Sequence, residues 1–126
     1  MNASRRMRAI RGAITVARDD PTVIAEATAE LVREIASRNA IDPDDVVSVL
    51  FTVTPDLLSG FPAAAAREAV WSDVPMLCVA EAPVQGALPR CIRVLVHVET
   101  TRARDAIRHV YLREARSLRP DIAADA

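Results

Sequence analysis

With 126 residues, the chain is long enough for one domain with a hydrophobic core and too short for two. Its residues are 51% hydrophobic but only 3% aromatic, so the core is built from aliphatic side chains. A formal net charge of -1 gives no indication of a nucleic-acid or anionic-membrane partner. No apolar stretch approaches the roughly 18 residues of a membrane span, and the N-terminus lacks the apolar segment of a signal peptide, which predicts a cytoplasmic protein.

The basic residues are all arginine: Lys and Arg together number 16 and no lysine is present, which excludes Schiff-base chemistry by lysine. The 2 cysteines and 2 histidines lack the close spacing of a zinc motif. Neither a phosphate-binding glycine loop nor a nucleophile elbow is present. Cys78 and Cys91 lie in strand-like segments and are predicted to be free, buried thiols. These absences point away from metal, covalent and redox catalysis.

Residues 8–16 alternate in the manner of a β-strand, and Gly12 would allow a close backbone approach or a bulge. The preceding residues 1–6 are expected to be mobile. An acidic pair followed by Pro21 then predicts a helix over residues 21–39, with one apolar stripe that packs against a sheet.

After a turn, residues 46–54 form a second strongly β-prone segment. The next stretch is rich in proline and glycine and is predicted to be irregular until a short helix over residues 63–70. A third strand, residues 76–81, ends with Glu81 next to a loop. Functional groups often collect at such strand ends, so Glu81 is a candidate site residue.

The most informative segment is the strand predicted over residues 91–98. One face is entirely β-branched and can only be buried: Ile92, Val94, Val96 and Val98. The opposite face contains Cys91, Arg93, Leu95 and His97. Because an unpaired buried charge is very costly, Arg93 must meet an anion, either a protein carboxylate such as Glu81 or a ligand.

The C-terminal segment leaves two interpretations open. Helical spacing fits part of it, while the alternation of residues 109–115 fits a fifth strand. Tyr111, the single tyrosine, would need a partner for its hydroxyl if it is buried. Residues 121–126 are small and polar and are expected to be mobile.

On the residues alone, the chain is an α+β domain that binds a small, multiply charged anion such as a carboxylate. Arg93, Glu81, Tyr111 and a thiol supply hydrogen bonds and charge for such a ligand. Taken alone, Arg11 and Arg67 fit a solvated surface position better than a site.

Six segments, in order and with similar spacing, resemble the AroH-class chorismate mutases. They are RAIRGAITV (8–16), TPDLLSGFPAAAAR (54–67), VPMLCVAE (74–81), CIRVLVHV (91–98), IRHVYL (107–112) and LRPD (118–121). The resemblance spans essentially the whole chain as a single domain. It implies a five-stranded mixed sheet with one long helix and short helices, assembled as a homotrimeric pseudo α/β barrel with active sites between subunits. It also favours a fifth strand near residues 110–113.

The resemblance further implies the Claisen rearrangement of chorismate to prephenate, on the route to phenylalanine and tyrosine. This unimolecular, pericyclic reaction needs no cofactor, nucleophile or proton transfer, in agreement with the absences above. By motif, Arg93 would donate to the ether oxygen of the substrate. Arg11 and Tyr111 would hold a substrate carboxylate, and Glu81 would accept from the ring hydroxyl.

The resemblance assigns the remaining pocket residues as well. Cys78 would lie beside the ring hydroxyl, with the backbone of Leu77, Val79 and Ala80 lining the pocket. A neighbouring subunit would supply Phe61, Ala63 and Arg67, and a mobile tail would supply Leu118 and Arg119. The chain departs from the pattern at three places: Ala64 stands where a basic residue is expected, Leu77 replaces a small polar residue, and the Val70-Trp71 junction is one residue short.

Three alternatives to a mutase remain open. An imine-deaminase-like trimer would also clamp a carboxylate with arginine between subunits, but its motifs do not match. A regulatory module would bind chorismate or prephenate without turnover. A purely structural trimer would show no ligand-dependent shift in melting temperature.

Overall fold

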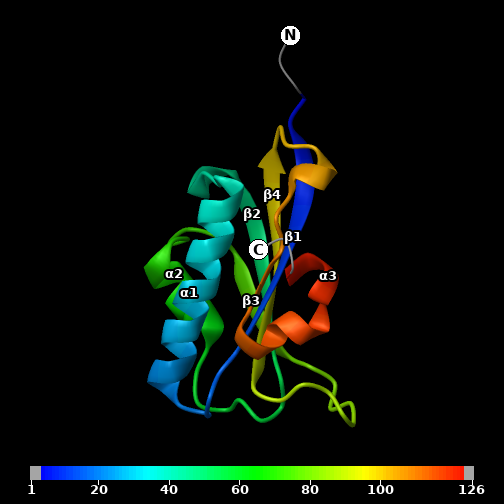
Figure 1. The fold of residues 1–126 in the computed structure, drawn as a ribbon. Helices are drawn as coiled ribbons and strands as arrows, with labels where there is room; N and C mark the ends of the chain where they lie inside the picture. Colours follow the sequence, from blue (N-terminus) through cyan, green and yellow to red (C-terminus); the bar gives the residue numbers. More distant parts are fainter. Residues whose placement is uncertain (1–3, 124–126) are drawn as a thin grey trace.

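A five-stranded mixed sheet in the order β3-β2-β4-β1-β5 organises the chain, whose computed structural model describes residues 4–123 (Figure 1). The strands are β1 (Arg6–Thr15), β2 (Val46–Val53), β3 (Met76–Ala80), β4 (Cys91–Thr100) and β5 (Val110–Leu112). The α-helices are α1 (Pro21–Asn39), α2 (Pro62–Ala69) and α3 (Pro120–Ala123). The central pairs β1–β4 and β4–β2 are antiparallel, whereas the outer strands β3 and β5 run parallel to their neighbours. The predicted α+β fold with a five-stranded mixed sheet is confirmed.

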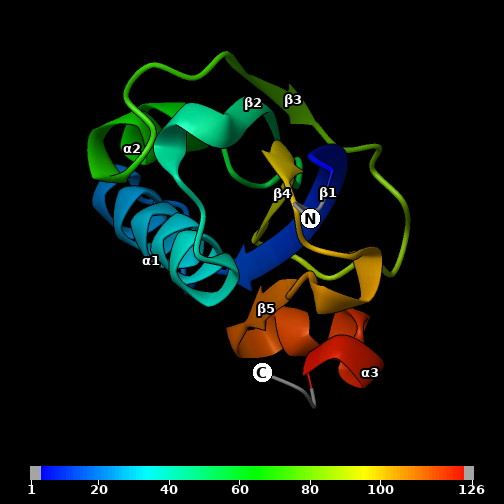
Figure 2. The ribbon, with the colours of Figure 1, turned by 90° about the horizontal axis from the view of Figure 1, so that it is seen from above.

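The two faces of the sheet are covered differently (Figures 1 and 2). Helices α1 and α2 pack on one face and enclose the main core, which includes Trp71 and Phe51. On the opposite face, the C-terminal segment packs over a smaller cluster around Tyr111. The rest of that second face carries no helix among the described residues.

Strand β4 lies at the centre of the sheet, as its sequence predicts. Ile92, Val94, Val96 and Val98 are at most 4% exposed and face the α1 core. Arg93, Leu95 and His97 on the other face are partly exposed. The strand runs two residues further than predicted, to Thr100.

Helix α1 begins and ends where its sequence signals predict. The Asp20 carboxylate accepts hydrogen bonds from the N–H groups of Thr22 and Val23, and Pro21 occupies the first turn. At the other end, Ala40 adopts the left-handed conformation with φ 49°, and its N–H donates back into the last turn.

The two interpretations of the C-terminal segment are resolved in favour of a short fifth strand. Val110, Tyr111 and Leu112 pair in parallel with Gly12, Ala13 and Ile14 of β1. Before them lies a 3₁₀ turn, η2 (Arg104–Ala106), and after them a 3₁₀ helix, η3 (Arg113–Leu118). The helical interpretation is therefore wrong over β5, because the free edge of β1 supplies backbone partners.

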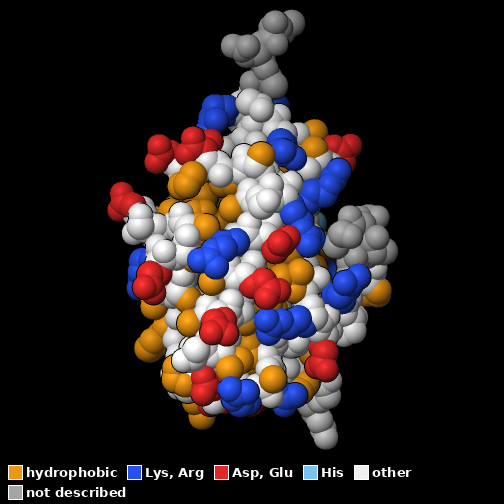
Figure 3. Space-filling model, turned by 60° about the vertical axis from the view of Figure 1, so that its left-hand side comes forward, with side chains coloured by type: hydrophobic (Ala, Val, Ile, Leu, Met, Phe, Trp, Pro, Cys, Tyr) orange, Lys and Arg blue, Asp and Glu red, His pale blue; other side chains and the backbone are white. Residues whose placement is uncertain are grey.

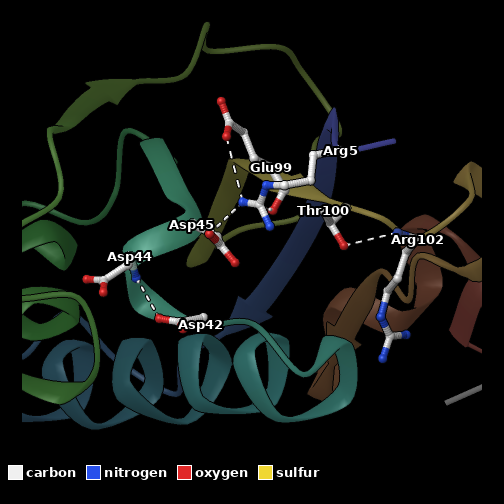
Figure 4. Close-up of polar contacts among 7 residues, drawn as sticks. All are labelled: Arg5, Asp42, Asp44, Asp45, Glu99, Thr100 and Arg102. Carbon is white, nitrogen blue, oxygen red and sulfur yellow. Dashed lines mark hydrogen bonds and ion pairs between the residues drawn. The ribbon is translucent and has the colours of Figure 1, made fainter. Parts of the chain in front are cut away.

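Arg5, which directly precedes β1, contacts charged side chains at one end of the sheet (Figure 4). Arg5 Nη2 lies 2.6 Å from Asp45 Oδ1 and 3.7 Å from Glu99 Oε2. The turn that carries Asp45 is in turn braced by Asp42, whose Oδ1 accepts from the N–H of Asp44 at 2.9 Å. Because these ion pairs are exposed, they contribute little to the free energy of unfolding. They hold Arg5 close to Asp45 and Glu99.

Element ends otherwise differ from the predicted ones by one or two residues. β1 begins at Arg6 rather than residue 8. The mobility expected of residues 1–6 and 121–126 stays a prediction, since residues 1–3 and 124–126 lie outside the described residues, while Arg6 and Asp121 fall within β1 and α3. Among the described helices, none is long and apolar enough to cross a membrane.

Charged side chains of both signs are interspersed on the side of the molecule seen in Figure 3. No large patch of a single sign is visible on that side. This mixture agrees with the formal net charge of -1 and gives no electrostatic basis for nucleic-acid binding there.

Gly12 lies on the side of β1 that packs against Leu31 and Ile35 of α1, and the β1–β4 register is unbroken through it. A Cβ at this position would stand 2.8 Å from Ile35 Cδ1 and 3.1 Å from Val94 Cγ1. We therefore expect Gly12→Ala to lower the free energy of unfolding by about 1–3 kcal/mol through overpacking. Urea unfolding at a fixed protein concentration measures the change. Gly60→Ala is the control, because its nearest contact would be 3.7 Å; equal losses in the two variants would contradict the prediction.

Candidate active site

The face of the sheet opposite α1 and α2 carries a row of side chains in register across all five strands. In strand order the row is Val79, Thr52, Arg93, Ala13 and Tyr111. The next row, two residues along the strands, contains Leu77, Leu50, Leu95 and Arg11. Because side chains alternate along a strand, both rows point to the same side of the sheet. The sheet therefore brings Arg93, Tyr111 and Arg11 onto one surface.

Glu81 joins this surface from the end of β3. Its N–H donates to the carbonyl of Val53 at 2.8 Å, which extends the ladder one residue beyond the strand. Its Oε2 accepts a hydrogen bond from Thr52 Oγ1 at 2.6 Å and lies 3.3 Å from Arg93 Nε. The predicted ion pair between Glu81 and Arg93 is confirmed.

This ion pair leaves the Arg93 guanidinium with donors to spare. Its Nε is buried, yet it is not aligned to hydrogen-bond Glu81, and no other acceptor among the described residues reaches it. The Arg93 side chain is 43% exposed, compared with 19% for Glu81. The exposed part of the guanidinium is therefore open to an oxygen-rich ligand, and the unpartnered Nε means that Glu81 alone does not satisfy the group.

Arg11 is exposed and lines an open groove of about 470 Å³ on the same face. Arg8, Arg104 and His109 also line it, and no acidic side chain is among its described lining residues. The groove is therefore positively charged, which favours an anion next to Arg11.

Tyr111 is 6% exposed and packs with Ala13, Cys91 and Ala115. No hydrogen bond to its hydroxyl is formed within residues 4–123. Leu118 packs against this cluster from the C-terminal segment. The Tyr111 hydroxyl is therefore another polar group available to a ligand.

The two cysteines are free, as predicted, but only Cys91 is buried, whereas Cys78 is partly exposed, and they lie on opposite faces. Cys91 is buried beside Tyr111, and burial raises its pKa to about 11, so it is not a reactive thiolate. Cys78 pairs with Phe51 and packs against the main core, on the side that α1 and α2 cover. Within one chain the Cys78 side chain lies on the face opposite Arg93, and its placement beside the ring hydroxyl of the substrate stays a prediction. Its neighbours Leu77 and Val79 do face the Arg93 side.

Three predicted pocket residues lie on the far side of the sheet. Phe61 is the N-cap of α2 and is 78% exposed, while Ala63 is buried and Arg67 is exposed along that helix. A single chain therefore does not bring them to Arg93. The remaining tail residue, Arg119, forms an ion pair with Asp121 at 2.9 Å.

The sequence alone does not predict two contacts beside Arg93. One is the hydrogen bond from Thr52 to Glu81. The other holds the start of β4, where the N–H of Cys91 donates to Thr54 Oγ1 at 3.0 Å. Strand alternation places both threonines on one face, but their partners depend on cross-strand register, which local sequence does not encode.

His109 is a positioning group for β1 rather than a free base. Its Nδ1 accepts a hydrogen bond from the Arg11 N–H at 2.9 Å. Burial lowers its pKa below the ordinary value of 6.5, and the charges of Arg11 and Arg119 lower it further. The folded structure therefore favours the neutral form of the His109 ring, whose Nδ1 can accept this hydrogen bond.

Fixed donors and one carboxylate make up the chemistry of this surface. No group of three or more His, Cys, Asp or Glu side chains among the described residues is placed to hold a metal ion. Preorganised donors of this kind can orient an anion and stabilise charge that develops on its oxygens.

A family model described as Chorismate mutase type I matches residues 7–122. The chain belongs to the type I chorismate mutase family. It is an isomerase of aromatic amino acid biosynthesis, and the recognition of its six sequence segments is confirmed.

Other comparisons agree with this chorismate mutase assignment. The chain is 50% identical over 117 residues to "Chorismate mutase AroH" of Thermus thermophilus, covering 92% of this chain and 96% of the relative. It is 46% identical over 117 residues to the Bacillus subtilis protein of the same name, covering 92% of each. A solved chorismate mutase from Clostridium thermocellum superposes with a TM-score of 0.85 at 43% identity, covering 87% of this chain and 98% of that one. These matches favour a mutase over the three alternatives raised by the sequence.

Protonation of His109 in this chorismate mutase should destabilise the fold. Because its pKa is lower in the folded than in the unfolded chain, stability is full above pH 6.5 and falls as the pH drops through the folded value. We expect His109→Asn, which keeps an acceptor but does not titrate, to lose less stability than wild type between about pH 7.5 and pH 5. Melting temperatures across that range measure the difference, with His97→Asn as the control. Parallel curves for wild type and His109→Asn would contradict the prediction.

Proposed function

We propose that the chain converts chorismate to prephenate by binding the substrate in its compact conformer on the Arg93 face. The ether C–O bond breaks while a new C–C bond forms within one cyclic transition state. The reaction is therefore an isomerisation that neither adds nor removes any atom. The proposal rests on the Arg93 guanidinium, whose side chain is 43% exposed and whose Nε has no hydrogen-bond partner among the described residues. Because the rearrangement uses no protein nucleophile, position and charge are what the protein contributes.

Arg93 is proposed to donate to the ether oxygen of chorismate. Negative charge grows on that oxygen as the bond breaks, so the hydrogen bond strengthens in the transition state relative to the bound substrate. A guanidinium suits this role because it stays charged and presents donors in a rigid plane. The backbone of Arg93 belongs to β4, the central strand of the sheet.

Glu81, Arg11 and Tyr111 are proposed to orient the substrate around that bond. Glu81 accepts from the ring hydroxyl, and its charge complements the positive character of the ring fragment. Arg11, at the groove, and Tyr111, with its open hydroxyl, hold a carboxylate. The backbone of Leu77, Cys78, Val79 and Ala80 would line the ring side of the pocket, since the Cys78 side chain itself points toward the main core.

The working form is proposed to be a homotrimer, a pseudo α/β barrel with each site between two subunits. Large apolar side chains are exposed on and near the Arg93 face: Met7 at 51%, Leu77 at 69% and Val79 at 44%. Strand β3 is also a sheet edge with backbone groups free to pair among the described residues. Exposed apolar surface of this kind marks an interaction site, and a neighbouring chain would cover it.

In this assembly a neighbouring subunit would bring Phe61, Ala63 and Arg67 to the Arg93 face. Phe61 stands out from the N-cap of α2 at 78% exposure, which suits insertion into a partner's pocket. Leu118 and Arg119 would close the site from the C-terminal segment. The cytoplasmic location inferred from the sequence stays a prediction.

Replacing Arg93 by citrulline, which keeps the shape but removes the charge, tests the central role. We expect kcat to fall at least about 100-fold, equivalent to about 2.7 kcal/mol, because one preorganised donor is lost. Arg93→Lys should also fail badly, since a flexible ammonium lacks the planar fork. Loss of chorismate absorbance measures the rate, with product confirmed as phenylpyruvate after acid treatment. A citrulline variant with near-normal kcat would remove Arg93 from the mechanism.

Mixing two inactive variants tests the shared site. If Arg93 and Arg67 of one site come from different subunits, trimers assembled from equal amounts of Arg93→Ala and Arg67→Ala chains should recover about a quarter of the wild-type sites. Arg93→Ala mixed with Glu81→Ala is the control, because both residues belong to the same chain and no wild-type site can form. Recovery in neither mixture, with mixed trimers demonstrated by mass, would overturn the shared site.

A further inference from the structure

The hydrogen bond from Thr52 to Glu81 has a consequence for the neighbouring arginine. Thr52 occupies the same row as Arg93, on the adjacent strand β2. Its Oγ1 donates to Glu81 Oε2 at 2.6 Å, a short bond to a charged acceptor. The Arg93 Nε atom approaches the same oxygen at 3.3 Å without hydrogen-bonding it.

The Thr52 hydroxyl therefore occupies one acceptor site of Oε2 and holds the carboxylate in an orientation in which Oε2 is not aligned with Arg93 Nε. Without that hydroxyl, the Glu81 carboxylate could turn to face Arg93 and form the two parallel hydrogen bonds that arginine and carboxylate prefer. Such a pair would occupy donors of Arg93 and turn the Glu81 oxygens away from a ligand. Because threonine is β-branched and its χ1 is stiff, the hydroxyl direction is fixed by the strand.

We propose that Thr52 is a positioning residue that prevents Glu81 and Arg93 from completing their ion pair with hydrogen bonds, so that both remain available to the substrate. The inference rests on the roles of Glu81 and Arg93 proposed above. It assigns to Thr52 a part in the reaction although its hydroxyl contacts only another side chain. Its loss should lower kcat, because the arginine donor would be occupied when the ether oxygen needs it.

Three substitutions separate this role from a structural one. Thr52→Val keeps the shape and removes the hydroxyl, and we expect kcat to fall about tenfold with KM changed less than about twofold. Thr52→Ser restores the donor and should recover most of the activity. Ser48→Ala is the matched control, because it removes a hydroxyl from the same face of β2 where the contact is His97 rather than Glu81. Melting temperature and oligomeric mass are measured for each variant.

A double-mutant cycle shows whether Thr52 acts through Glu81. In a Glu81→Gln background, Thr52→Val should cost little further activity. Equal losses from Thr52→Val in both backgrounds, or equal losses from Thr52→Val and Thr52→Ser, would overturn the inference. If Glu81→Gln itself has wild-type activity, the proposed role of Glu81 fails. If Glu81→Gln is impaired while Thr52→Val is normal, the role of Glu81 stands and the inference about Thr52 fails.

Discussion

The structure depends on the two unlike faces of β4. One face is a column of β-branched side chains sealed against α1, and the other carries Arg93 among partly exposed neighbours. A register slip of one residue would place the guanidinium in the aliphatic core and the valines outside, a very costly exchange. The apolar face therefore fixes the register of β4 against both β1 and β2. That register in turn sets the row in which Thr52 and Ala13 flank the arginine, with Tyr111 next to Ala13 on β5.

The electrostatics of the site follow from an ion pair that stops short of full hydrogen bonding. A completed pair between Glu81 and Arg93 would satisfy both charges and leave little for a ligand. Their 3.3 Å contact, with Nε unpartnered, instead balances the charge while leaving donors free. For a pericyclic reaction, the protein contributes mainly two things: it binds the reactive conformer, and it places a cation where the ether oxygen becomes negative.

The sequence predicts those parts of this fold that local rules control. The Asp20-Pro21 start of α1 and the alternation of β4 are both confirmed. The three-residue strand β5 is too short for periodicity to distinguish from a helix, and it forms because β1 offers a free edge. The Thr52–Glu81 contact depends on how β2 and β3 align, which local sequence does not encode. The alternation of side chains along a strand could have predicted that Cys78 and Glu81 point to opposite faces, because they are three positions apart.

A site between subunits also offsets the free-energy cost of removing water from Arg93 and Arg11. Arg93 and Arg11 lie on a face that one chain leaves partly open, so during folding of the monomer neither charge loses its full hydration. In the proposed trimer, the exposed apolar side chains such as Leu77 would drive association and close the pocket around these arginines. Desolvation, which strengthens the interaction with a bound dianion, would then come with assembly rather than with folding. In that trimer, burial of apolar surface would offset the free-energy cost of removing water from the arginines. Activity would then depend on assembly.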